Sequence, residues 1–108
     1  MYTSCDELFK FTIPAVRVAA ARELNSKYHV GQADIARELG IAQAAVSKYL
    51  SGRYSVKVRK LASIIEASNL HAPVVKAAAA EAKGASVAAK IDEVASSAPV
   101  VKAAMKLI

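Results

Sequence analysis

The sequence predicts an all-α protein: a compact helical bundle that contains a helix-turn-helix and is followed by an alanine-rich helical segment. Alanine supplies much of the 55% hydrophobic content, and alanine has the highest helix propensity of all residues. The 108 residues include only four glycines and three prolines, so few positions interrupt a helix. Apolar residues recur at spacings of three and four, as expected of helices with one buried face.

The first part of the chain is expected to form two helices that are separated at Pro14. Ser4 and Glu7 have the spacing of a capping box, which predicts a helix over residues 4–11. Proline is favoured in the first turn of a helix, so a second helix is expected over residues 14–28. The expected buried face of this second helix carries Val16, Ala19, Ala20, Leu24 and Tyr28.

The stretch from Gln32 to Ser51 has the pattern of two short helices that meet at a glycine. The first is expected from Gln32 or Ala33 to Leu39, and the second from about Gln43 to Leu50. Gly40 lies between them, where the backbone at a helix C-terminus often turns left-handed and a β-carbon is penalised. Apolar residues occur where two helices at a steep angle must touch: Ile35, Ala36, Leu39, Ile41, Val46, Tyr49 and Leu50.

The other side of the second short helix carries small and hydrogen-bonding side chains. Gln43, Ala44, Ser47 and Lys48 fall on this side, where they could enter a groove of a duplex without a clash. This arrangement predicts a helix-turn-helix that binds DNA.

The net charge of +6 is unevenly distributed along the chain. Five cations and no acid occur between residues 48 and 60: Lys48, Arg53, Lys57, Arg59 and Lys60. Such a segment attracts a polyanion, either nucleic acid or an anionic membrane surface. A charged run alone is often only a solvated face. Here the run continues directly from the expected DNA-contacting helix, which favours DNA.

The residues from Gln32 to Gly52 resemble the helix-turn-helix of the lambda repressor and Cro-like family. Counted from Gln32, alanine is at the fifth position, glycine at the ninth and valine at the fifteenth, and glutamines begin both helices. The wider stretch, with CDEL, IPAVR and QADIARELGIAQAAVSKYLSGR, is similar to small archaeal transcriptional regulators of the same superfamily. The resemblance covers about half of the chain. Some members of that archaeal group have further cysteines near the C-terminus, which this chain lacks, so no cluster or metal is inferred.

The resemblance implies a role for each exposed residue of the motif. Gln43 would contact a base edge, and Gln32 would brace it and touch a phosphate. A carboxamide bonds in bidentate fashion to adenine, which is worth about 1 to 3 kcal/mol of discrimination. Ala44 suits a thymine methyl group, while Ser47 and Lys48 come next on the same face, where Lys48 would contact guanine or the backbone. Phosphate contacts are expected from Arg53, Tyr54, Ser55 and Lys57.

The remainder of the chain divides at residues 71–73. Ser55 is the expected N-cap of a helix from Val56 to about Ser68, with Val58, Leu61 and Ile65 facing inward and Ile64 as a further candidate for that face. We therefore expect a DNA-binding domain over residues 1–70 and a helical C-terminal segment over residues 71–108.

Three further helices are expected in the C-terminal segment, the first closed by Gly84. The sequence APVVKAA occurs at residues 72–78 and again at residues 98–104. The repeat is either duplicated low-complexity sequence or two equivalent apolar faces that pair within one chain or between chains. Because exposed apolar surface of this extent is a liability, we expect pairing and predict a homodimer through these helices.

No motif in the sequence indicates an enzyme, a cofactor or a metal site. Cys5 is the only cysteine, and His29 and His71 have no acid or nucleophile at a telling spacing, so both are expected at the surface or as caps. No apolar run approaches the roughly 18 residues of a membrane span. Asp6 and Glu7 lie where a secretory signal would have positive charge, so a cytoplasmic location is expected.

These observations predict a sequence-specific transcriptional regulator, most simply a repressor, that inserts the helix from about Gln43 to Leu50 into the major groove as a homodimer. Two alternatives remain open. The fold could serve as a protein-interaction module or antitoxin-like partner, or the protein could bind DNA without sequence preference as an architectural protein.

Overall fold

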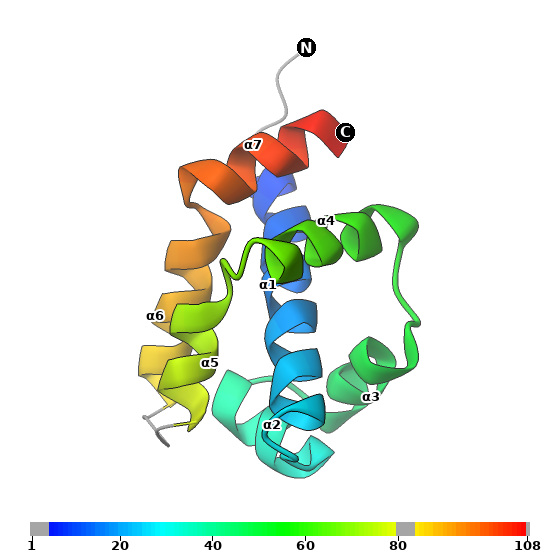
Figure 1. Cartoon of the computed structure of the whole chain (residues 1–108), viewed down its shortest axis with the longest axis vertical. Helices are drawn as coiled ribbons and strands as arrows, with labels where there is room; N and C mark the ends of the chain where they lie inside the picture. The colour runs from blue at the N-terminus through cyan, green and yellow to red at the C-terminus, as the bar shows by residue number, and fades with distance from the viewer. Residues whose placement is uncertain (1–4, 80–83, 108) are drawn as a thin grey trace.

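The computed structural model describes residues 5–79 and 84–107 and confirms the all-α class (Figure 1). Seven helices make up this part of the chain. They are α1 (Cys5–Ser26), α2 (Gln32–Leu39), α3 (Gln43–Ser51), α4 (Val56–Ala67), α5 (Ala72–Ala79), α6 (Gly84–Ala95) and α7 (Ala98–Leu107).

Helix α1 runs along the centre of the molecule and contacts each of the other six helices. Most of its middle is buried, and the buried side chains point in several directions: Ala15, Val16, Val18, Ala19, Ala20, Ala21 and Leu24. A helix that is apolar on nearly all sides must be surrounded by other elements. The small alanine side chains allow the neighbouring helices to approach closely.

The predicted break at Pro14 is wrong, because α1 continues through this residue. A proline inside a helix removes one backbone hydrogen bond and costs roughly 3 kcal/mol. Phe11 and Ile13 on one side of Pro14, and Ala15 and Val16 on the other, pack into the same core. We infer that their joint burial offsets the cost of the proline. Residue 4, the predicted cap, lies outside the described residues.

Helix α1 also ends earlier than predicted. Its last residue is Ser26, and Tyr28, which was expected on the buried face, is 46% exposed. His29 then adopts a left-handed conformation with φ 56°, and the amide of Val30 donates to the carbonyl of Leu24. Because the turn toward α2 begins after Ser26, Tyr28 does not lie on the buried face of α1.

Helix α4 forms as predicted, except that Ile64, a candidate for the inward face, is 38% exposed. The Ser55 hydroxyl accepts a hydrogen bond from the Val58 amide over 3.2 Å, which confirms Ser55 as the N-cap. Leu61 and Ile65 are fully buried, and the helix packs between α1 and α7.

The three C-terminal helices pack back onto the rest of the molecule. Helix α5 contacts α1 and α6, α6 contacts α1 and α2, and α7 contacts α1 and α4. Their buried side chains join the same core as those of α1 to α4: Val74, Val75, Val87, Ile91, Val94, Val100 and Ala104. The apolar faces of these helices are therefore covered within the chain.

The repeated sequence begins α5 and α7. In both copies the first valine, Val74 or Val100, is fully buried, and the lysine, Lys76 or Lys102, is exposed. The two copies do not contact each other in the described residues; each lies against α1. The prediction that Gly84 closes a helix is wrong, because α6 begins at Gly84; residues 80–83, where the preceding helix was expected to end, are outside the described part.

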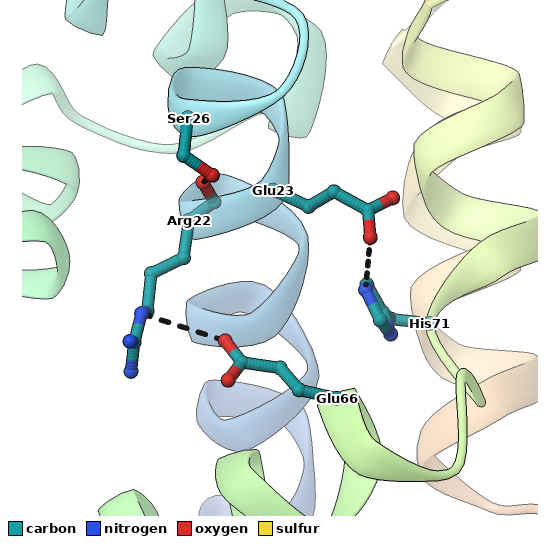
Figure 2. Close-up of polar contacts among 5 residues, drawn as sticks. All are labelled: Arg22, Glu23, Ser26, Glu66 and His71. Carbon is teal, nitrogen blue, oxygen red and sulfur yellow. Dashed lines mark hydrogen bonds and ion pairs between the residues drawn. The ribbon is translucent and has the colours of Figure 1, made fainter.

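Polar contacts fasten the start of the C-terminal segment to α1 (Figure 2). His71 was expected at the surface or as a cap; it directly precedes α5 and is only 2% exposed, and its Nε2 lies 3.0 Å from Oε1 of Glu23. Beside this pair, Nε of Arg22 lies 3.4 Å from Oε1 of Glu66, which joins α1 to α4. These four side chains border a cavity of about 270 Å³. Because they pair with one another, we assign the cluster a structural role.

Candidate nucleic-acid interface

A tight turn joins α2 to α3. Gly40 has φ 69° and ψ 36°, which confirms the predicted left-handed conformation. Its amide donates to the carbonyl of Arg37 over 3.3 Å, and the amide of Ile41 donates to the carbonyl of Ala36 over 3.0 Å. The bond from Ile41 to Ala36 spans five residues along the chain, and together with the bond from Gly40 it forms the Schellman motif that ends many helices.

The residues predicted to hold α2 and α3 together occupy the expected places. Ile35, Ala36 and Leu39 of α2 and Val46 of α3 are buried, and Ile41, Tyr49 and Leu50 are half-buried against the same core. Helix α3 also packs on α1. Its inward face thus positions the helix, which leaves the opposite face available for a ligand.

That opposite face of α3 carries the four predicted base-contacting residues. Gln43, Ala44, Ser47 and Lys48 are all exposed. Their spacings of three and four place them on one side of the helix. The structure therefore brings them together on the solvent side.

The N-termini of α2 and α3 have no side-chain caps. Gly31 and Ala42 occupy the cap positions, and neither provides a side-chain hydrogen bond. Uncapped amide groups and the helix dipole favour an anion at such an end. The first turn of α3 contains no acidic residue, whereas that of α2 contains Asp34, which pairs with Arg37 over 3.2 Å. Gln32, at the start of α2, is exposed.

The basic segment is defined here as Lys48, Arg53, Lys57, Arg59 and Lys60. All five side chains are exposed. Within residues 5–79 and 84–107, the ion pairs lie elsewhere on the molecule and involve Arg22, Arg37, His71 and Lys90. The carboxylates of the described residues therefore do not neutralise the charge of the basic segment. The segment continues from the exposed face of α3 toward α4.

The segment between α3 and α4 begins with a second left-handed glycine. Gly52 has φ 78°, and the amide of Arg53 donates to the carbonyl of Lys48 over 2.9 Å. Arg53 is exposed, and so is Lys57 in the first turn of α4. The Ser55 oxygen already accepts from Val58, so its remaining role toward a phosphate is as an O–H donor.

Tyr54 is held by aromatic and cationic neighbours. Its ring meets that of Tyr49 nearly edge to face, with centroids 6.5 Å apart and planes at 74°. The guanidinium carbon of Arg59 lies 5.8 Å from the Tyr54 centroid, and Nη2 of Arg59 donates to the Gly52 carbonyl over 3.0 Å. Sequence reasoning placed Arg59 in the basic segment but missed these contacts. The sequence signal for these contacts was Arg59 itself, which lies one helical turn after the Ser55 cap and five residues after the aromatic Tyr54.

Two short helices joined by a tight turn, an exposed polar face on the second, and a basic segment after it define a DNA-binding helix-turn-helix domain. A family model described as Helix-turn-helix matches residues 19–73, about half of the chain. The chain belongs to this lambda-repressor-like helix-turn-helix family, whose fold is that of DNA-binding transcription regulators. A search of curated proteins and a search of solved structures each returned no match.

Among the described residues, no three histidine, cysteine, aspartate or glutamate side chains gather closely enough to hold a metal ion. None of the helices in this part of the chain is long and apolar enough to cross a membrane.

Proposed function

We propose that the protein is a sequence-specific transcriptional regulator that inserts α3 into the major groove of DNA. The observation that carries this proposal is the exposed face of α3, continued by a basic segment that carries no compensating acid. A helix with its side chains is about 10 to 12 Å across, and the major groove is about 12 Å wide. Helix α3 therefore has the size and charge for this groove.

Base discrimination is assigned to the exposed face of α3. Gln43 provides a carboxamide, whose donor and acceptor match N7 and N6 of adenine. Ala44 provides a methyl group for contact with thymine, and Ser47 and Lys48 extend the face by one turn. Lys48 would contact guanine or, through its charge, a phosphate.

Phosphate contacts are assigned to residues that flank α3. Gln32 lies at the uncapped start of α2, and Arg53, Tyr54 and Ser55 lie between α3 and α4. Lys57 is exposed in the first turn of α4. Contacts of this kind fix the register of a protein on a duplex but carry no sequence information.

We further propose that the protein acts as a homodimeric repressor in the cytoplasm, with residues 1–70 binding DNA and residues 71–108 forming the dimer contact. The inward faces of α5, α6 and α7 are already buried, so such a contact would use outward residues such as Met105, which is 63% exposed. Residues 1–70 and 71–108 are distinguished here only by their proposed roles, because their described side chains share one hydrophobic core. The narrower similarity to archaeal regulators also remains a prediction.

The experiment that tests the proposal is a selection of preferred duplexes from a random pool, with the mass of the protein in solution measured in parallel. A two-fold symmetric dimer should select an inverted repeat whose half-sites lie about 34 Å apart, one turn of the duplex. A unique site without symmetry, bound by a monomer, would leave DNA binding intact and eliminate the dimer.

Two substitutions separate base contacts from phosphate contacts. Gln43→Ala should lower affinity for the preferred duplex by about 1 to 3 kcal/mol and leave binding to scrambled duplex unchanged. Lys57→Ala should weaken binding to both duplexes and reduce the salt slope by about 1. If both variants lost affinity equally for all sequences, the assignment of roles would be wrong.

Salt dependence separates the proposal from its alternatives. If the five cations of the basic segment each neutralise a phosphate, the slope of log affinity against log salt should be about −4.5. A protein-interaction module of the same fold would show almost no such affinity. An architectural protein would show the slope but would bind scrambled competitor DNA as well as the selected site.

A further inference from the structure

Helices α3 and α4 carry the predicted base and phosphate contacts, yet they do not pack directly on each other in the described residues. Each packs on α1, and a short loop connects them (Figure 1). A duplex bound by both helices would require a defined angle between them. Packing on α1 contributes to that angle, and a contact across the loop would help to set it.

Arg59 provides such a contact. From the second turn of α4 its guanidinium donates to the Gly52 carbonyl at the end of α3 over 3.0 Å. The same group lies 5.8 Å from the centre of the Tyr54 ring, and Tyr54 packs edge to face against Tyr49 of α3. A continuous chain of contacts thus links α4 to α3 through the loop.

We propose that Arg59 is a positioning residue for DNA binding, which orients α3 and the loop at residues 52–55 without itself contacting a base. The proposal rests on the proposed function. A planar guanidinium has several donors in a fixed geometry, so it can donate to a carbonyl while another part of it lies near an aromatic ring; a lysine ammonium is a compact point charge that reproduces this geometry poorly. The identity of the side chain should therefore matter as much as its charge.

The position of the loop gives the contact its functional consequence. Arg53 and Ser55 are proposed phosphate contacts on the segment that Arg59 holds, and Lys48 lies in the last turns of α3. A binding group that is misplaced by about 1 Å loses much of its effect. Because phosphate contacts fix the register of a protein on a duplex, a displaced loop should shift α3 relative to the base edges. This shift should reduce the preference for the selected duplex more than general DNA affinity, which depends on the retained charges.

The first test uses the free protein. We compare Arg59→Lys, which keeps the charge, with Lys60→Met, which removes a charge from the neighbouring exposed residue. The ring proton resonances of Tyr54 and Tyr49 should shift in Arg59→Lys and stay in place in Lys60→Met. Unchanged tyrosine resonances in Arg59→Lys would overturn the proposal.

The second test measures binding of the same proteins to the selected and scrambled duplexes over a range of salt. Arg59→Lys should bind the selected duplex about tenfold more weakly, since a charge-assisted hydrogen bond and an aromatic contact are lost. Its affinity for scrambled duplex should stay within about twofold, and its salt slope should not change. If Arg59 only neutralised a phosphate, Arg59→Lys would equal the wild type, and this result would refute a positioning role.

A second variant guards against a general loss of folding. Tyr54→Leu removes the ring and keeps Arg59, whereas Tyr54→Phe removes only the hydroxyl, which is the proposed phosphate contact. Tyr54→Leu should reproduce the loss of preference and Tyr54→Phe should not, and both should unfold cooperatively on heating. If Tyr54→Leu kept the full preference for the selected over the scrambled duplex, the contacts from Arg59 through Tyr54 would not position α3. If the wild type bound no duplex, the proposed function would fail together with the role of Arg59. If the wild type discriminated and Arg59→Lys did too, only the Arg59 proposal would fail.

Discussion

The two ends of α3 have similar backbone turns but are held by different side chains. At the first end, Gly40 is left-handed and the turn is closed by backbone bonds and by burial of Leu39 and Ile41. At the second end, Gly52 is also left-handed, but the loop is held by the Arg59 guanidinium and by the Ser55 cap. The first end depends on apolar burial, and the second depends on polar and cationic contacts at the surface.

The two ends of α3 should therefore contribute to different properties of the protein. Burial at the start of α3 is insensitive to salt and fixes the helix to the core. Exposed polar contacts at its end are individually worth little in stability and change with the surroundings. We therefore expect substitutions at the first end to affect unfolding, and substitutions at the second to affect DNA preference.

Substitution of a leucine near each end of α3 should give the largest of the expected effects on the free energy of unfolding. Leu39→Ala removes a side chain that is 1% exposed and should lower the free energy of unfolding by about 2 to 5 kcal/mol. Leu50→Ala, at the half-buried end of α3, should cost about 1 to 2 kcal/mol, because less area is removed from the core. Urea unfolding of both variants provides the measurement. Equal losses would contradict the distinction between the two ends.

The two left-handed glycines should cost similar amounts but differ in what they disturb. Gly40→Ala and Gly52→Ala should each destabilise the protein by about 1 to 2 kcal/mol, the penalty of a β-carbon in this conformation. A β-carbon at residue 40 meets no atom within 4 Å, whereas one at residue 52 lies 3.4 Å from Nη2 of Arg59. Only Gly52→Ala should also shift the Tyr54 resonances. A shift of the same size in Gly40→Ala would show that the two ends are coupled.

The helix caps should give the smallest effects, and in opposite directions. Ser55→Ala removes an observed cap of α4 and should cost about 1 kcal/mol, while Ala42→Ser supplies a missing cap to α3 and should gain about 0.5 to 1 kcal/mol. Ala42 has φ −70° and ψ 145°, an extended conformation that suits a cap. Thermal unfolding would measure both. A loss of stability in Ala42→Ser would mean that the start of α3 needs its methyl group.

The helix-turn-helix was predictable because its determinants are local. The turn at Gly40 and the cap at Ser55 each involve residues within a few positions of one another, and Ile35, Leu39 and Val46 lie within one short stretch of the chain. Local patterns gave the bounds of α2, α3 and α4 to within one residue, and they placed the exposed face of α3 correctly.

Other predictions failed where distant residues decide the outcome. Pro14 signals a helix start by local rules, but the core packs on both sides of it and α1 continues. His71 has no partner nearby in sequence, yet it is buried against Glu23, 48 positions away. Arg59 contacts Gly52, seven positions away, only because the loop turns back over the start of α4.

The amino-acid sequence by itself determined the all-α class, the helix-turn-helix and the charge of the segment after it, because these follow from propensity, periodicity and composition within short stretches. The tertiary structure alone decided that the alanine-rich helices cover the core of their own chain, and that a single helix, α1, contacts all the others. It also decided how α3 is held at its two ends. The physical reason is that burial and surface contacts depend on which distant residues meet, and a local pattern does not specify its partner.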